Sequence, residues 1–218
     1  MKGRISGELG TDPIRIHSVL SGQTLYHGSA AIVIAGPNGA GKSTTAPVLL
    51  KGTLGVTEFV NADVIAQGLS AFQPESAAFH AGRVMLERLH YLASERVDFA
   101  FETTLASRSF APWIAKLKQT GYIFHLVFLW LPSADFAVAR IAERVRMGGH
   151  GVPDGTIRRR YKKGIRNFFQ LYRPLSNTWR MYDNSEPTWP RLVADGGVAA
   201  SETIYDPKTW RMIRGESL

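Results

Sequence analysis

The segment GPNGAGKS, at residues 36–43, matches the pattern G-x-x-x-x-G-K-[ST] at every fixed position. In a loop of this kind, backbone N–H groups surround phosphate oxygens, and glycines permit the close approach and the backbone angles that this requires. The alternative is a glycine-rich turn that binds nothing. It is disfavoured because the segment lies between an apolar run and a predicted helix, which is the context that phosphate binding requires.

This loop predicts a binding site for a nucleoside triphosphate with its magnesium ion. Lys42 would reach the β- and γ-phosphates, and the Ser43 hydroxyl would coordinate Mg²⁺. ATP and Mg²⁺ are therefore the cofactors that we expect. The residues predicted to bind them are Gly36, Asn38, Gly39, Ala40, Gly41, Lys42, Ser43 and Thr44, with Ser43 as the metal ligand.

Two acidic residues follow at the ends of predicted strands. Asp63 closes the segment TEFVNAD, and Glu102 follows the segment DFAF. The carboxyl ends of parallel strands border the ligand crevice, so both carboxylates should face the phosphate loop. One can accept a proton from an attacking hydroxyl, and the other can position substrate or hold the waters of the metal. Thr103 and Thr104 add hydroxyls at this edge. The alternative for Asp63 is a helix N-cap, because NADVIAQGL could begin a helix there.

A basic stretch from Arg144 to Phe168 holds eight Arg or Lys against one acid, and it accounts for most of the net charge of +8. In phosphate-loop kinases a cationic segment between two helices closes over the phosphates, and its arginines neutralise the transferring group. The segment GGHG supplies the flexibility that such a lid needs. We expect either Arg144 or Arg146 before the glycine pair, and either Arg159 or Arg160 after it, to contact ATP.

Other residues of this stretch have simpler interpretations. Lys162, Lys163 and Arg166 are expected on a solvated helix face. His150 could hydrogen-bond a phosphate, and a turn histidine without a role is the alternative. A lone histidine gives no metal site.

The segments around these motifs are predicted to alternate between β-strands and α-helices. Strands are predicted over 30–35, 57–63, 98–103, 122–131, 179–185 and 191–197, and helices over 42–51, 74–96, 109–119, 133–147 and 153–172. Such alternation implies a mostly parallel sheet with right-handed crossovers and helices on both faces. The predicted fold is thus an α/β three-layer P-loop NTPase fold, like that of nucleotide kinases, with a helical lid.

Length and composition fit one globular core. The chain has 218 residues, 44% of them hydrophobic, which is enough for one domain. We divide it into an N-terminal extension (1–29), a P-loop kinase domain (30–197) and a C-terminal extension packed on that domain (198–218). The absence of cysteine excludes disulfides, thiolate metal sites and a cysteine nucleophile. No apolar run is long enough for a membrane span or a signal peptide, so a cytoplasmic protein is expected.

In combination, the motifs resemble the zeta-toxin family of P-loop kinases. The resemblance runs from about Ala31 to Asp195 and rests on GPNGAGKST, NADVIAQGLS, FAFETTLASR and RVRMGGHGVPDGTIRRRYKKGIRNFF. It implies transfer of the γ-phosphoryl group of Mg-ATP to a hydroxyl of a small molecule. Better-known family members phosphorylate the amino sugar of UDP-N-acetylglucosamine. The site residues that it implies are Lys42 and Ser43 for ATP and Mg²⁺, Asp63 as the general base, and Glu102 and Thr104 for substrate.

One departure from the family pattern concerns the substrate. Family members tend to show E-G-T-x-R, in which the Arg helps to hold the substrate. Here Thr103 replaces the Gly and Ala106 replaces the Arg, so the nearest arginine is Arg108. A substrate phosphate contact would have moved to Arg108 or been lost. The predicted substrate residues are Asp63, Glu102, Thr103, Thr104 and Arg108, and the predicted catalytic residues are Asp63, Lys42, Arg144, Arg146 and Arg160.

Other functions remain as alternatives. The acceptor could instead be NAD, a nucleotide, a simple sugar or a polynucleotide end. The basic stretch also suggests a nucleic-acid-binding NTPase, but its charge is confined to one segment and no nucleic-acid module is present. A third possibility is an ATP-dependent switch that acts through a partner. The resemblance implies that such a partner could be a small antitoxin protein, and residues 1–29 could instead form a built-in cap.

Overall fold

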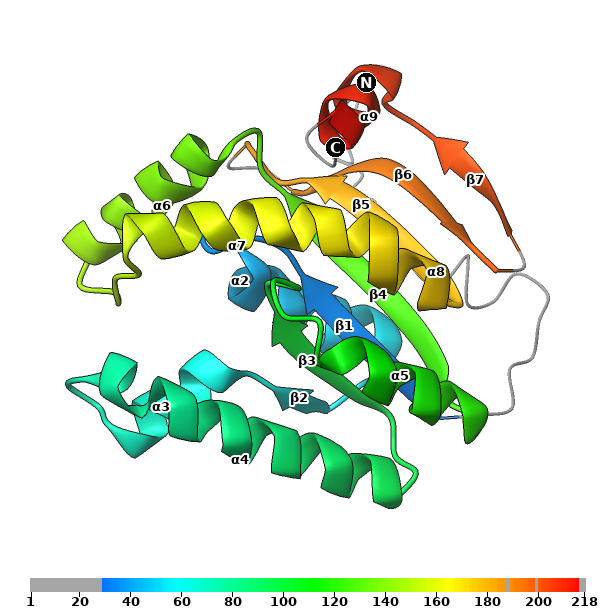
Figure 1. The fold of residues 1–218 in the computed structure, drawn as a ribbon, viewed down its shortest axis with the longest axis horizontal. Coiled ribbons are helices and arrows are strands. Elements are labelled where there is room, and N and C mark those ends of the chain that lie inside the picture. Colours follow the sequence, from blue (N-terminus) through cyan, green and yellow to red (C-terminus); the bar gives the residue numbers. More distant parts are fainter. Residues whose placement is uncertain (1–28, 187–188, 199, 216–218) are drawn as a thin grey trace, which may run out of the picture.

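The computed structural model describes residues 29–186, 189–198 and 200–215. Its centre is a seven-stranded sheet with the strand order β2-β3-β1-β4-β5-β6-β7. The first five strands in this order pair in parallel, and β6 and β7 are antiparallel additions at one edge. In Figure 1, α5 and α7 lie over one face of the sheet and α2 lies on the other. The expected mostly parallel α/β sheet is therefore confirmed.

The predicted strands and helices are present with shifted ends. The helix at 62–69 was expected only as the alternative for Asp63, and the strand at 200–204 and the helix at 207–215 were not predicted. The strands are β1 (Ala30–Ala35), β2 (Glu58–Val60), β3 (Phe99–Thr103), β4 (Ile123–Trp130), β5 (Thr178–Asp183), β6 (Arg191–Gly197) and β7 (Ala200–Ile204). The α-helices are α2 (Lys42–Pro47), α3 (Ala62–Leu69), α4 (Pro74–Ser94), α5 (Phe110–Gln119), α6 (Ala134–Arg146), α7 (Asp154–Asn167), α8 (Arg173–Leu175) and α9 (Pro207–Gly215). Two π-helical segments, η1 (Val48–Leu54) and η2 (Phe168–Tyr172), continue α2 and α7.

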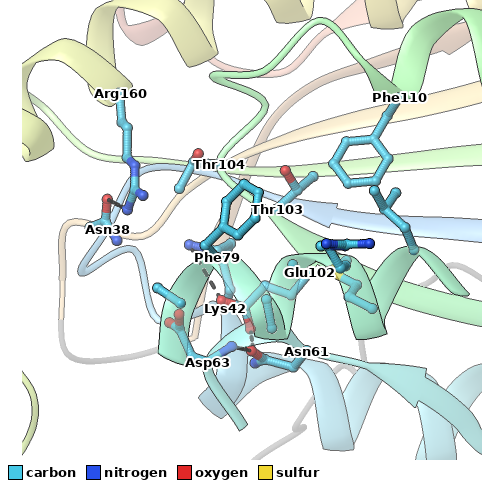
Figure 2. A pocket seen from close by; sticks show the side chains of 16 residues that line it. Asn38, Lys42, Asn61, Asp63, Phe79, Glu102, Thr103, Thr104, Phe110 and Arg160 are labelled. Atoms are coloured by element: carbon cyan, nitrogen blue, oxygen red, sulfur yellow. Dashed lines mark hydrogen bonds and ion pairs between the residues drawn. The ribbon is translucent and has the colours of Figure 1, made fainter. Parts of the chain in front are cut away.

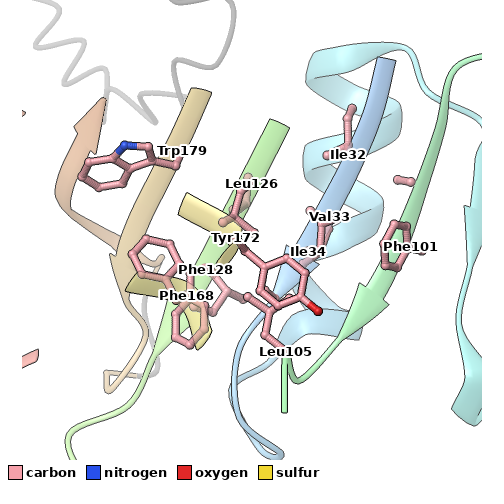
Figure 3. Packing of buried hydrophobic residues seen from close by; sticks show 14 of the residues in the cluster. Ile32, Val33, Ile34, Phe101, Leu105, Leu126, Phe128, Phe168, Tyr172 and Trp179 are labelled. Atoms are coloured by element: carbon pink, nitrogen blue, oxygen red, sulfur yellow. The ribbon is translucent and has the colours of Figure 1, made fainter. Parts of the chain in front are cut away.

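The core lies on both sides of the central strands. All eight residues of β4 are buried, as expected of a parallel strand that is covered on both faces. The apolar face of α7 and η2, formed by Ile157, Tyr161, Ile165, Phe168 and Tyr172, is buried as well. Figure 3 shows Phe168 beside Phe128, with ring centroids 5.2 Å apart. The basic helix is therefore packed firmly on the sheet through its apolar side.

The strand predicted over 57–63 is shorter than expected, and this changes the position of Asp63. Strand β2 ends at Val60, and Asn61 becomes the N-cap of α3. The Asn61 side-chain oxygen accepts hydrogen bonds from the backbone N–H groups of Asp63 (2.8 Å) and Val64 (3.4 Å). A side-chain cap of this kind favours starting a helix over continuing a strand. Asp63 therefore lies in the first turn of α3, neither at a strand end nor at the N-cap.

Two predicted helices change their hydrogen-bonding pattern near their ends. The helix predicted over 42–51 becomes π-helical after Pro47, where the missing N–H of proline removes one α-helical hydrogen bond. The helix predicted to reach Tyr172 is π-helical from Phe168 onward.

The predicted extensions differ in what the structure describes. Within the C-terminal extension (198–218), β7 pairs with β6 at the sheet edge, and α9 brings Trp210 into a stack on Trp179. The N-terminal extension (1–29) lies outside the described residues except for Ser29. None of the described helices is long and apolar enough to cross a membrane.

His125 of β4 should make the stability of the fold depend on pH. Its side chain is 8% exposed, and its Nδ1 lies 2.7 Å from the Thr178 hydroxyl. Burial, and next the charge of Arg180, lower the pKa of His125 from 6.5 to about 4. Between these values the unfolded chain binds a proton that the folded chain does not, so stability falls as the pH falls.

We expect the free energy of unfolding to drop by about 2 kcal/mol between pH 7 and pH 5 from this residue alone. Urea denaturation at several pH values measures the drop. The matched variant His125→Gln carries no titrating ring and should lose correspondingly less stability over that range. Equal losses in the two proteins would contradict the assignment.

Candidate functional site

The loop between β1 and α2 has the backbone shape that its glycines allow. Gly36, Gly39 and Gly41 have φ angles of 145°, 80° and 76°, in a region that other residues rarely adopt. A Cβ added at Gly36 would lie 2.3 Å from the Leu129 carbonyl oxygen, and one added at Gly41 would lie 2.7 Å from the Asn184 side chain. Larger residues would displace the loop, so its curvature depends on these glycines.

Two residues that sequence reasoning missed hold this loop in place. The Asn184 side-chain nitrogen donates to the Ala40 carbonyl at 2.8 Å. Arg140 of α6 donates to the carbonyls of Asn184 (2.7 Å) and Ser185 (2.9 Å). Asn184 follows β5 and lies 144 residues from Ala40 in the chain, so no local pattern could have revealed the contact.

A hydrogen-bonded network joins the loop to the ends of β2 and β3. Lys42 is 6% exposed, and its Nζ donates to the Pro37 carbonyl at 2.9 Å and lies 3.6 Å from Glu102 Oε1. Glu102 Oε2 accepts hydrogen bonds from the Ser43 hydroxyl (2.7 Å) and the Asn61 side chain (2.8 Å). Figure 2 shows Lys42, Asn61 and Glu102 converging at the floor of one pocket. The network brings a cation and a hydroxyl into contact with the same carboxylate.

Burial controls the charge balance of this network. Burial lowers the pKa of Lys42, and the negative charges of Glu102 and Asp63 oppose that shift. A buried ammonium group needs anionic partners to remain charged. Phosphate groups placed beside Lys42 would add to the negative charge that Glu102 and Asp63 supply and would further favour its charged form.

The oxygen atoms of the network fit a hard divalent cation. Ser43 and Glu102 offer a hydroxyl and a carboxylate 2.7 Å apart, and Mg²⁺ prefers oxygen ligands and keeps several waters or phosphate oxygens. Among the described residues, no group of three or more His, Cys, Asp or Glu side chains could hold a metal by itself. Magnesium binding at Ser43 therefore stays a prediction.

The pocket above this network has a volume of about 400 Å³. Asp63 lines it from the first turn of α3, and its side chain is exposed. The predicted site residues that the structure brings together here are Asn38, Lys42, Asp63, Glu102, Thr103, Thr104 and Arg160. Asn61, which sequence reasoning did not include, lines the same pocket.

The other predicted cations do not line this pocket. Arg144 donates to the His150 carbonyl at 2.7 Å, and Arg146 pairs with Glu143. Arg159 is exposed and does not line the pocket, whereas Arg160 lies 3.5 Å from the Asn38 side-chain oxygen in the phosphate loop. The structure thus distinguishes between the two arginines of α7, and contacts of the others with ATP stay predictions.

Three further basic residues and Arg108 also lie outside the pocket. Lys162, Lys163 and Arg166 are exposed on α7, as expected for a solvated face. Arg108 lines a separate hollow between α5 and the segment that includes Gln170 and Leu171. The structure therefore does not bring Arg108 to the pocket, because the chain after Ala106 turns toward α5.

The loop that follows β3 is held by α7 and η2. The Asn167 side chain donates to the Leu105 carbonyl at 2.7 Å, and the Tyr172 hydroxyl donates to the Ser107 carbonyl at 2.6 Å. Leu105 has a φ of 54°, a strained value for a residue with a side chain. The Thr103 hydroxyl accepts from the Leu105 N–H at 3.1 Å and stabilises the turn. Contacts from α7 and η2 therefore fix the position of the loop that follows β3.

Gly164 of α7 tests this contact. A Cβ added there would lie 2.5 Å from the Thr104 carbonyl oxygen, so Gly164→Ala must push α7 away from the loop. We expect the free energy of unfolding to fall by about 1–3 kcal/mol, as for other overpacked sites. The control is Gly155→Ala in the same helix, where an added Cβ meets nothing within 4 Å and helix propensity should improve. Equal stability of the two variants in urea denaturation would contradict the contact.

Comparisons with known proteins agree with this fold. Residues 32–163 match a family model described as an AAA domain. A Haemophilus influenzae protein described as uncharacterized is 29% identical over 131 residues, which cover 60% of this chain and 91% of that protein.

Two solved structures have a similar fold at low sequence identity. The AvrRxo1-ORF1:-ORF2 complex with ATP has a TM-score of 0.69 at 17% identity, covering 93% of this chain and 67% of that chain. A structure from the PezAT chromosomal toxin–antitoxin system of Streptococcus pneumoniae has a TM-score of 0.55 at 18% identity, covering 82% and 76%. At such identities the likeness shows the fold alone, and that fold is the α/β P-loop fold.

Proposed function

The chain belongs to the AAA domain family, and we propose that it is a kinase that phosphorylates a hydroxyl of a small, nucleotide-linked metabolite. One observation carries the proposal. Lys42 of the phosphate loop, Asp63 and Glu102 line one pocket of about 400 Å³. A cation for phosphates and a carboxylate for a hydroxyl proton are the two requirements of phosphoryl transfer to an alcohol.

Three residues in or beside the phosphate loop are proposed to bind ATP and its metal ion. Mg-ATP bound here would supply the transferable phosphoryl group, with the metal neutralising part of its charge. Lys42 would hold the β- and γ-phosphates, and Ser43 would hold the metal. Arg160, 3.5 Å from Asn38, would add positive charge where negative charge develops during transfer.

Asp63 is the stronger candidate for the general base. Within the described part of the chain, its carboxylate has no hydrogen bond or ion pair, whereas the Glu102 carboxylate contacts Ser43, Asn61 and Lys42. A carboxylate without partners can accept the proton of an acceptor hydroxyl as the oxygen attacks. Glu102 would orient the phosphate loop and the acceptor, together with Thr104.

We further propose that the activity is of the zeta-toxin type, with UDP-N-acetylglucosamine as the leading acceptor. The four motifs in order support this, as does the likeness in fold to the PezAT structure. An antitoxin protein as partner is proposed on the same grounds. Ala106 and the position of Arg108 outside the pocket leave NAD, a nucleotide, a sugar or a polynucleotide end as alternative acceptors.

Mass spectrometry of incubations with Mg-ATP tests the proposal. The acceptors are UDP-N-acetylglucosamine, other nucleotide sugars, NAD, free nucleotides, simple sugars and a short RNA. A phosphorylated UDP-sugar would support the full proposal, and another phosphorylated acceptor would support the kinase and replace the substrate. No phosphorylated product from any of these acceptors would overturn the proposed function.

A further inference from the structure

Helix α4 forms a second wall of the pocket. The roles proposed above for the phosphate loop, Asp63 and Glu102 do not involve this wall. The helix contributes Ala78, Phe79, Gly82, Arg83, Met85 and Leu86. Residues 79, 82, 83 and 86 are spaced by three and four positions, so they share one face of the helix. Figure 2 shows Phe79 in the middle of the pocket, with Phe110 on the opposite side from Asn38 and Arg160. The pocket therefore extends well beyond the phosphate loop.

The Phe79 side chain lines the pocket but is largely exposed, so it contributes little to the packing of the protein core. Its relative exposure is 82% although it lines the pocket, so its ring faces open space. Phe110 also lines the pocket, and its ring is held against Phe101 with centroids 5.1 Å apart. Exposed aromatic rings beside a pocket are groups on which planar ligands such as nucleobases stack.

Arg83 is a cation without a partner in the described part of the chain. The other two cations that line the pocket have contacts, Lys42 with Glu102 and Arg160 with Asn38. Arg83 forms no hydrogen bond or ion pair with any described residue, and its side chain is exposed. A guanidinium group at a pocket wall suits a phosphate or carboxylate, which it can bind through two parallel hydrogen bonds.

Gly82 keeps the space between these side chains open. It lies inside the long helix α4, where glycine is less favourable than alanine. A Cβ added at Gly82 would meet no atom within 4 Å, so no neighbour in the protein requires glycine here. Since Gly82 lines the pocket, its missing side chain leaves room for a ligand.

We infer that this face of α4 is a subsite for a nucleoside phosphate, with the base on Phe79 and a phosphate on Arg83. The combination of an aromatic platform, an unpaired arginine and an open helix position fits a ligand with both a ring and an anion. The identification of that ligand as the acceptor rests on the proposed function. Asp63 lines the same pocket, so a hydroxyl attached to such a ligand can reach the proposed base.

Calorimetric titration of the full chain measures this subsite directly. The phosphate loop is first saturated with Mg²⁺ and a non-hydrolysable ATP analogue. The probes are UMP and AMP, their nucleosides uridine and adenosine, and ribose 5-phosphate. At least one nucleotide should bind about tenfold or more tightly than its nucleoside and than ribose 5-phosphate, because only the nucleotide uses both contacts.

Two variants separate the contributions of the ring and the cation. Phe79→Ala should weaken nucleotide and nucleoside binding by about tenfold and leave ribose 5-phosphate unchanged. Arg83→Ala should weaken nucleotide and ribose 5-phosphate binding by about tenfold and leave the nucleoside unchanged. The matched controls are Phe72→Ala, at a side chain that is 98% exposed and outside the pocket, and Arg88→Ala, whose side chain pairs with Glu58. Neither control should change any of these affinities.

A third variant tests the subsite by filling it with a larger side chain, whereas the first two each remove one contact. Gly82→Leu should abolish nucleotide binding at the subsite while binding of the ATP analogue persists, because the new side chain would occupy the pocket and its Cβ meets no atom within 4 Å. Gly68→Leu in α3 is its control, since a Cβ added there also meets nothing within 4 Å and Gly68 does not line the pocket.

The outcomes separate this inference from the proposed function. Nucleotides that bind no better than ribose 5-phosphate, or that bind equally to the Phe79, Arg83 and Gly82 variants, would overturn the subsite. If an acceptor is phosphorylated and its KM is unchanged in those variants, the kinase stands and the subsite is wrong. If the subsite binds nucleotides as described and no acceptor is phosphorylated, the proposed function alone is overturned.

Discussion

Replacing Lys42 by alanine is expected to lower phosphoryl transfer by about a hundred- to a thousandfold and to weaken ATP binding. The ammonium group is buried among Pro37, Glu102 and the phosphate loop, where a charge acts more strongly than in water. Its pKa is lowered by burial, and phosphate oxygens would favour its charged form. Neither of the other two described cations that line the pocket occupies this position, because Arg160 contacts Asn38 and Arg83 lies on α4.

Calorimetry with an ATP analogue and the rate of product formation measure the two effects. Lys116→Ala is the control, because this lysine is exposed on α5 and does not line the pocket. Glu102 keeps its hydrogen bonds from Ser43 and Asn61 in the Lys42 variant, so the fold should persist, which thermal denaturation checks. Undiminished transfer by Lys42→Ala would overturn the assignment of the phosphate loop.

The parts of the site that could be predicted depend on local sequence. The glycines of residues 36–41 adopt φ angles that other residues avoid, and the short apolar run before them predicts a buried strand. The helix from Pro74 and the buried face of α7 follow from side chains at helical spacing. In each case the determining interactions lie within a few residues of one another.

Competition between local interactions explains the displaced Asp63. The segment TEFVNAD reads as a strand throughout, yet the Asn61 side chain caps the N–H groups of Asp63 and Val64. The cap ends β2 at Val60 and turns the carboxylate into the pocket from a helix. The prediction that Asp63 faces the phosphate loop is consistent with its place in the pocket. The predicted reason, a position at the end of a strand, is wrong because β2 ends at Val60.

Contacts between distant segments could not be predicted at all. Asn184 supports Ala40 through a side chain that follows a late strand, and Arg140 supports Asn184 from α6. Arg160 and Arg159 differ only in their rotation about α7, which spacing alone does not fix. Phe79 and Arg83 look like ordinary surface residues of an amphipathic helix until the fold places α4 beside the phosphate loop.

Asp63→Asn is expected to preserve ATP binding and to lower phosphoryl transfer by about a hundredfold or more, which is the usual contribution of a general base. The amide keeps the size of the side chain and its place in the first turn of α3, but it cannot accept a proton from the acceptor. Since the Asp63 carboxylate has no hydrogen bond or ion pair with another described residue, its replacement breaks no contact that holds the pocket together.

The comparison with Glu102→Gln distinguishes the base from the residue that organises the loop. Glu102 contacts Lys42, Ser43 and Asn61, so its amide variant should weaken ATP binding as well as transfer. Rates measured at saturating ATP separate the two, because only the Asp63 variant should remain slow with its ATP site full. Near-normal transfer by Asp63→Asn would move the base elsewhere, and Glu102, the other carboxylate that lines the pocket, would then be the first residue to test.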